Sequence, residues 1–168
     1  MTRVYVSIGT NIDREHNVRA AVDALRRHYG ALRISPVYET AAVGFEGHDF
    51  YNLVVGFDTD EQPETLRDGF QAIESEQGRR RGGERFASRT LDIDLLTWGD
   101  CVMESAGLTL PRGEILKHAF VLRPLADIAP ETTHPVAGLT YSELWTRFEG
   151  NGEDMREVEL GFRSDRSD

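Results

Sequence analysis

Two aspartates in one short alternating segment are well suited to metal chemistry. Residues 89–96 read Arg-Thr-Leu-Asp-Ile-Asp-Leu-Leu, so Asp92 and Asp94 alternate with aliphatic residues. This alternation predicts a strand that carries both carboxylates on one face and sends the aliphatic side chains into a core. At a rise of about 3.3 Å per residue the two aspartates lie about 6.6 Å apart along the strand, close enough to share a metal centre.

The aspartate pair favours a hard divalent cation. Mg2+ usually takes one or two carboxylates and completes its shell with water and substrate phosphates. Two ionised carboxylates side by side also repel each other unless a cation neutralises them. The simpler alternative is a half-exposed edge strand with two solvated aspartates, and the segment alone does not decide between the two interpretations.

An arginine-rich segment leads into this strand. Residues 79–89 contain Gly82, Gly83, a single acidic residue (Glu84) and five arginines: Arg79, Arg80, Arg81, Arg85 and Arg89. The glycines predict a mobile loop, and guanidinium groups match phosphate oxygens in a bidentate way. The chain has only one lysine, Lys117, so the clustering of the arginines is informative and their identity is not. The two segments together predict a polyphosphate substrate with its metal ions.

Length and composition predict one soluble domain. The 168 residues suffice for a single substantial core, and the net charge of -10 argues against general binding to nucleic acid or to an anionic membrane. Cys101 is the one cysteine, which excludes an intramolecular disulfide and a cysteine zinc site. No secretory signal and no segment of membrane-spanning length is found, so we expect a cytoplasmic protein.

The elements that must position these residues follow a recognisable order. Apolar periodicity predicts strands at 3–8, 32–39 and 51–58 before the aspartate strand, with helices from Asp13 to Tyr29 and from 61–64 to about 77–78. The order βαββαβ is that of a ferredoxin-like α+β fold, a mostly antiparallel sheet with helices packed on its faces. Pro36 predicts an edge position or a bulge in the second strand.

The remaining segments are expected to be short. We expect a loop at 40–50, long enough to suggest function, a hairpin at 101–110, a polar loop at 111–117, a partial helix at 119–128 and a short helix at 141–148. Residues 1–148 then form a single domain. The charged, apolar-poor residues 149–168 are expected to be a frayed tail.

Several ordered motifs resemble one family. The motifs are Ile8–Asn11, Tyr38–Thr40, Phe50–Asn52, Glu74–Gly78, Arg89–Asp94, Phe120–Leu125 and Ile128–Pro130. Over about residues 3–145 the chain resembles 6-hydroxymethyl-7,8-dihydropterin pyrophosphokinases, whose most specific signature is Arg-Thr-Leu-Asp-(Ile/Leu)-Asp. The resemblance implies an ATP-dependent diphosphotransferase of folate biosynthesis. Such an enzyme moves pyrophosphate from ATP to the hydroxymethyl group of the pterin and releases AMP.

The resemblance also implies roles for individual residues. Asp92 and Asp94 would hold two Mg2+ ions that bridge the triphosphate. Four arginines would act in catalysis by neutralising phosphates: Arg79, Arg81, Arg85 and Arg89. The residues expected at ATP are Glu74, Arg79, Arg81, Arg89, Leu95, Thr109, Arg112 and His118. The residues expected at the pterin are Thr40, Ala41, Val43, Gly44, Phe50, Asn52, Asp92 and Phe120. Phe50 and Phe120 would sandwich the ring, and Asn52 would hydrogen-bond its polar edge.

The chain departs from the family pattern in three places. Arg112 follows Pro111 where the family usually has histidine, and His118 stands where the family has arginine. Residues 86–88 read Phe-Ala-Ser where Trp-Gly-Pro is common. Arg112 is a candidate to restore the phosphate-binding charge that a neutral His118 lacks.

Other functions stay open. A related transferase acting on a modified pterin is one alternative, and a non-catalytic nucleotide- or pterin-binding paralogue is another. Without the resemblance, ordinary core packing is the simpler interpretation of Phe50 and Phe120. The expected partners are ATP and the dihydropterin, and we expect a monomer.

Overall fold

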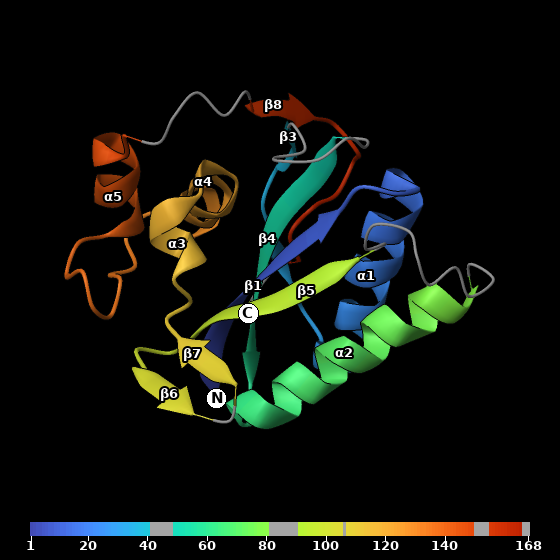
Figure 1. The fold of residues 1–168 in the computed structure, drawn as a ribbon, viewed down its shortest axis with the longest axis horizontal. Helices are drawn as coiled ribbons and strands as arrows, with labels where there is room; N and C mark the ends of the chain where they lie inside the picture. Colours follow the sequence, from blue (N-terminus) through green and yellow to red (C-terminus); the bar gives the residue numbers. More distant parts are fainter. Residues whose placement is uncertain (41–48, 81–90, 106, 150–154, 166–168) are drawn as a thin grey trace.

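The computed structural model describes residues 1–40, 49–80, 91–105, 107–149 and 155–165, with the backbone alone at 79 and 80. Its strands are β1 (Thr2–Thr10), β2 (Arg33–Ile34), β3 (Val37–Thr40), β4 (Phe50–Thr59), β5 (Asp92–Trp98), β6 (Met103–Ser105), β7 (Leu108–Leu110) and β8 (Met155–Val158). Its helices are α1 (Arg14–Tyr29), α2 (Pro63–Arg80), α3 (Glu114–Lys117), α4 (Ala119–Ile128) and α5 (Tyr141–Arg147) (Figure 1). None of these helices is long and apolar enough to cross a membrane.

The main sheet has the order β5-β1-β4-β3-β8, and β2 also pairs with β4. Every pairing in it is antiparallel. The crossover through α1 places β3 two strands away from β1, with β4 between them, and α2 returns the chain to β5 on the other side of β1. This arrangement confirms the ferredoxin-like α+β fold. Strands β6 and β7 form the expected separate hairpin.

The sheet has a hydrophobic core on each face. One core lies under α1 and α2 and includes Val4, Val6 and Ile8 of β1. The other lies under α3, α4 and α5 and includes Tyr5 of β1. Figure 1 shows the two helix layers on opposite sides of the strands. Adjacent residues of β1 therefore enter different cores, as the pleat of a strand requires.

Three segments differ from the predicted elements. Helix α2 continues through Gly78 to Arg80, so the first two residues of the arginine-rich segment are helical. A short helix, α3, replaces part of the expected polar loop, because the fully buried Ile115 anchors it. The predicted second strand is divided into β2 and β3 at Ser35 and Pro36. Proline has no N–H for the ladder, and Ser35 instead exchanges hydrogen bonds with Val54.

The C-terminal segment is ordered where the structure describes it, in contrast to the frayed tail that the sequence predicts. Strand β8 pairs with β3 along its whole length. Beyond it, Ser164 Oγ accepts from Ile34 N at 2.7 Å, and Asp165 Oδ2 accepts from Leu32 N at 3.0 Å. The composition of residues 149–168 did not predict this order, because the partners that stabilise the segment lie far away in the sequence, at β3 and next to β2. Backbone groups at the edge of a sheet are available to pair with another segment.

Candidate active site

The two aspartates of β5 lie on one face of the strand, as predicted. Asp92 and Asp94 are half-buried, whereas Ile93 and Leu95 are 4% and 3% exposed and belong to the core under α1 and α2. Leu95 therefore lies on the opposite face of the sheet from the carboxylates. The aspartates share the face that α4 covers, because the next residue of that face, Leu96, belongs to the second core.

The sheet register places Asp92 in a row with the predicted pterin residues. Asp92 pairs with Gly9 of β1, Gly9 pairs with Asn52 of β4, and Asn52 pairs with Tyr38 of β3. Residues directly opposite in an antiparallel ladder point to the same face. The row therefore carries a carboxylate, a position without a side chain and then an amide across one face of the sheet.

The aspartate pair fits Mg2+ by its chemistry. Both donors are carboxylates, and both side chains are half-buried rather than enclosed. Within the described part of the chain, no cluster of three or more His, Cys, Asp or Glu side chains is arranged to hold a metal. A cation that needs only one or two protein carboxylates is compatible with this donor set.

Glu74 forms a hydrogen bond with β5 at Ile93, the residue between the two aspartates. Its Oε2 accepts a hydrogen bond of 2.6 Å from the backbone N–H of Ile93. Among the described strands β5 is the outer strand of the sheet on this side, so a side chain rather than a neighbouring strand accepts from this N–H. Glu74, predicted to contact ATP, thus fixes the strand that carries the aspartates.

Arg112 connects the hairpin to the aspartates. Its backbone N–H donates to Leu96 O at 2.9 Å, its Nε donates to Glu114 Oε2 at 2.6 Å, and its Nη2 lies 3.7 Å from Asp94 Oδ1. Both side chains of the Arg112–Asp94 pair remain more than one-third exposed. A permanent cation therefore lies beside a candidate metal ligand, where a phosphate group could also reach it.

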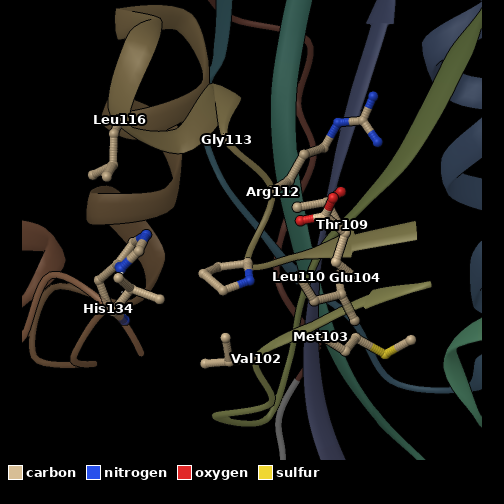
Figure 2. Close-up of a pocket in the computed structure, with 11 residues that line it drawn as sticks. Val102, Met103, Glu104, Thr109, Leu110, Arg112, Gly113, Leu116 and His134 are labelled. Carbon is tan, nitrogen blue, oxygen red and sulfur yellow. Dashed lines mark hydrogen bonds between the residues drawn. The ribbon is translucent and has the colours of Figure 1, made fainter. Parts of the chain in front are cut away.

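A cavity of about 410 Å³ adjoins this arginine (Figure 2). Thr109 and Glu104 of the hairpin form one side of it, and Leu116 and His134 form the other. The Arg112 guanidinium extends away from Leu116 and His134. The structure therefore brings Arg112 and Thr109, two residues predicted at ATP, to the wall of one cavity.

The predicted pterin residues Thr40 and Asn52 are in direct contact. Asn52 Nδ2 donates to Thr40 Oγ1 at 2.9 Å, and both side chains are buried. A Cβ atom on Gly9 would lie 2.9 Å from Asn52 Oδ1, which is closer than real Cβ contacts. Gly9 therefore leaves room for the amide, a role that the sequence analysis did not assign although it quoted the motif.

The predicted aromatic pair is only partly buried. Phe120 packs at the rim of the second core, and its ring stacks on His118 with centroids 4.8 Å apart and an interplanar angle of 13°. Phe50 is half-buried at the start of β4. Neither ring is a fully buried core residue, so each keeps exposed surface for a ligand.

Seven predicted site residues lie outside the described residues or have only their backbone described. Those outside the described residues are Ala41, Val43, Gly44, Arg81, Arg85 and Arg89. Arg79 lies in the last turn of α2, where only the backbone is described.

Tyr38 of β3 contacts two residues of α4, and the sequence alone did not predict these contacts. Tyr38 Oη donates to Asp127 Oδ2 at 2.5 Å, and burial together with this carboxylate raises the pKa of the tyrosine. Arg123 of α4 lies over the Tyr38 ring, 4.8 Å from its centroid. No local periodicity could reveal this link, because the tyrosine and the aspartate are 89 residues apart.

Most of the sequence matches a known family. A sequence model of 7,8-dihydro-6-hydroxymethylpterin-pyrophosphokinase (HPPK) matches residues 5–130. The chain belongs to the HPPK family. The matched range runs from within β1 to beyond the end of α4, and it includes Asp92, Asp94, Asn52 and Phe120.

Curated HPPK relatives cover most of the chain. The 2-amino-4-hydroxy-6-hydroxymethyldihydropteridine pyrophosphokinase of Pseudomonas aeruginosa is 39% identical over 137 residues, which are 79% of this chain and 84% of that protein. The enzyme of that name from Bacillus subtilis is 37% identical over 131 residues, 76% and 78% of the two chains. The folic acid synthesis protein fol1 of Schizosaccharomyces pombe is 32% identical over 152 residues, and this chain spans about a fifth of its length (21%).

Solved HPPK structures share the fold. The HPPK-DHPS of Plasmodium falciparum with pterin and p-hydroxybenzoate superimposes with a TM-score of 0.72 at 17% identity, over 88% of this chain and 43% of that chain. The A437G variant of HPPK-DHPS gives a TM-score of 0.70 at 15% identity, over 88% and 45%. At this level of identity the likeness concerns the fold.

Proposed function

We propose that this protein transfers pyrophosphate from ATP to the hydroxymethyl group of 6-hydroxymethyl-7,8-dihydropterin. The hydroxymethyl oxygen forms a bond to the β-phosphorus, the bond from that phosphorus to the α,β-bridging oxygen breaks, and AMP leaves. The substrate hydroxyl proton passes to solvent. The observation that carries the proposal is the row of Asp92, Gly9 and Asn52 on one face of the sheet in a chain of this family.

The proposed cofactor is Mg2+, as two ions bound with ATP. Bound Mg2+ supplies charge neutralisation and orientation of the triphosphate. Asp92 and Asp94 would hold it, and Glu74 keeps their strand in place through Ile93 N. Phosphoryl-type transfer needs positioning and charge neutralisation more than covalent help from the protein. The proposed reaction therefore requires no covalent intermediate with the protein.

Arg112 supplies a cation on the hairpin side of the aspartates. Its hydrogen bond to Glu114 fixes the guanidinium near Asp94. A fixed cation at a developing phosphate charge stabilises the transition state more than the ground state. The arginines of residues 79–89 are proposed to neutralise phosphate charge in the same way.

The pterin would bind at the other end of the row. Asn52 offers an amide whose orientation is set by Thr40 Oγ1, and amides can both donate to and accept from a heterocycle edge. Phe120 and Phe50 offer aromatic faces, and stacking on such faces suits a flat ring. We further propose that the protein is cytoplasmic and acts as a monomer. Sedimentation of the purified protein would test the monomeric state.

The deciding experiment is AMP release from ATP in the presence of Mg2+ and the dihydropterin alcohol. Turnover that requires all three components, and that Asp94→Ala abolishes, is the expected result. A protein that binds pterin or ATP without releasing AMP would contradict the proposal and favour a non-catalytic paralogue. Turnover that appears only with a modified pterin would instead identify a divergent transferase.

A further inference from the structure

Glu39 of β3 is held between two arginines from opposite ends of the chain. Arg14, the first residue of α1, donates from Nη1 to Glu39 Oε2 at 2.6 Å, and Arg156 of β8 donates from Nη2 to Oε1. The Glu39 side chain is only 13% exposed. The arginines, Arg14 first, hold the pKa of this carboxyl below its usual value, so the carboxylate is charged at neutral pH.

This cluster lies directly behind the predicted pterin residues. Adjacent strand residues point to opposite faces, so Glu39 points away from the face that carries Thr40. Arg14 also donates to the backbone oxygen of Asp49 at 2.9 Å and lies over the Tyr51 ring, 4.2 Å from its centroid. The cluster thus contacts β3 next to Thr40, and it contacts the two residues that flank Phe50.

Strand β8 also pairs with this end of β3. Arg156 is paired directly opposite Glu39, and Met155 is paired opposite Thr40. Residues 155–158 lie beyond the range 5–130 that matches the family model. The C-terminal strand is therefore an addition to the matched region, and it is attached beside Thr40.

We propose that Arg156 is a positioning residue for the pterin, acting through Glu39 on the Thr40–Asn52 hydrogen bond. The C-terminal strand thereby sets the geometry of the substrate amide without touching the substrate. This inference rests on the proposed function, because it takes Asn52 as a pterin contact. Arg156 is 77% exposed, so its effect on overall stability is expected to be small.

The test is Arg156→Glu in the full-length protein, which places like charges directly opposite each other on β3 and β8. We expect about 1.4-fold to fivefold weaker binding of the dihydropterin, the scale of one cross-strand pair. Binding of a non-hydrolysable ATP analogue with Mg2+ stays unchanged, and the KM for pterin rises while kcat does not. Arg156→Lys, which keeps the charge, should bind pterin nearly as the wild type does.

Two controls make the test specific. Arg163→Glu makes the same charge change at an exposed residue of the same segment and should leave pterin affinity unchanged. In a Glu39→Gln background, Arg156→Glu should cause no further loss, because the repulsion needs the carboxylate. Unchanged pterin affinity in Arg156→Glu, or equal losses for both ligands, would overturn the proposal.

A wild-type protein that binds no pterin would contradict the proposed function rather than the positioning role. Amide hydrogen exchange then tests the positioning role without a ligand. Faster exchange at Thr40 and Asn52 in Arg156→Glu, but not in Arg163→Glu, supports it. Identical exchange in the two variants overturns it.

Discussion

The guanidinium of Arg112 lies beside the carboxylate of Asp94, with Nη2 and Oδ1 3.7 Å apart, and Glu114 holds it there. A cation that neutralises Asp94 in this way also competes with a metal ion for the carboxylate. When a metal occupies Asp94, the same guanidinium is available to a phosphate oxygen. We therefore propose that the pair would link metal binding to nucleotide binding at one residue.

Replacing Arg112 should affect turnover and metal binding in opposite directions. Arg112→Ala is expected to lower kcat by about a hundredfold to a thousandfold, the scale of one lost charge-stabilising donor in a closed site. Mn2+ binding without nucleotide should become tighter, because a competing cation is removed. Steady-state kinetics and a Mn2+ titration measure the two effects. Arg33→Ala, at an exposed arginine of β2, is the control and should change neither.

Removing either aspartate should abolish turnover without unfolding the protein. In Asp92→Ala and Asp94→Ala the apolar face of β5, which carries Ile93, keeps its packing. In Asp92→Ala, loss of one of two neighbouring like charges should leave the thermal midpoint unchanged or raise it in the absence of metal. In Asp94→Ala the partly exposed pair with Arg112 is also lost, which should cost less than about 1 kcal/mol. The AMP-release assay and thermal denaturation measure the two properties. Loss of the two-metal clamp should reduce turnover by far more than about threefold. Activity within about threefold of wild type in either variant would therefore exclude the metal role.

The ring of Phe120 should contribute to pterin binding and not to ATP binding. Phe120→Ala is expected to weaken pterin binding by about 1–3 kcal/mol, borrowing the scale of base–aromatic stacking. Calorimetry with each ligand measures the difference. Phe148→Ala is a matched control, because Phe148 packs against the same core but stacks on Trp145. Equal losses for both ligands in Phe120→Ala would show that the residue serves the core alone.

A methyl group at position 9 should disturb the amide of Asn52. The added Cβ atom would lie 2.9 Å from Asn52 Oδ1, so the side chain must shift. We expect Gly9→Ala to weaken pterin binding by about tenfold, comparable with one lost hydrogen bond of about 1.4 kcal/mol. The control is the double variant with Asn52→Ala, in which Gly9→Ala should add nothing. Additive losses would mean that Gly9 acts elsewhere.

The C-terminal attachment should weaken in acid. The backbone N–H of Leu32, and then Arg26, hold the pKa of Asp165 below its ordinary value. Its contribution to stability is therefore complete above the unfolded pKa of about 3.9 and is lost as the pH falls through the lower folded-state pKa.

Asp165→Asn tests this pH dependence. The variant should be destabilised by less than about 1 kcal/mol at pH 7, because the carboxylate is partly exposed. Its difference from wild type should narrow below about pH 4, where the wild-type carboxylate also becomes neutral. Denaturant unfolding at several pH values measures it. Asp100→Asn, at an exposed turn, is the control. A difference that is constant with pH would contradict the assigned partners.

The sequence by itself determined the aspartate face and the order of the elements. The period-two alternation around Asp92 and Asp94 specifies which side chains share a face, because the pleat is a local property of the chain. The buried stripe of α1 and the alternation of β1 are equally local. These local patterns, taken in order, were sufficient for the ferredoxin-like fold.

Only the tertiary structure decided which residues support that face. Glu74 reaches Ile93 N across 19 residues, and Arg156 reaches Glu39 across 117. Arg112 reaches Asp94 because its own backbone N–H is bonded to Leu96 O. The periodicity of a sequence does not predict which distant residue a polar side chain will contact. Its partner is set by strand register and by helix packing, which exist only once the chain has folded.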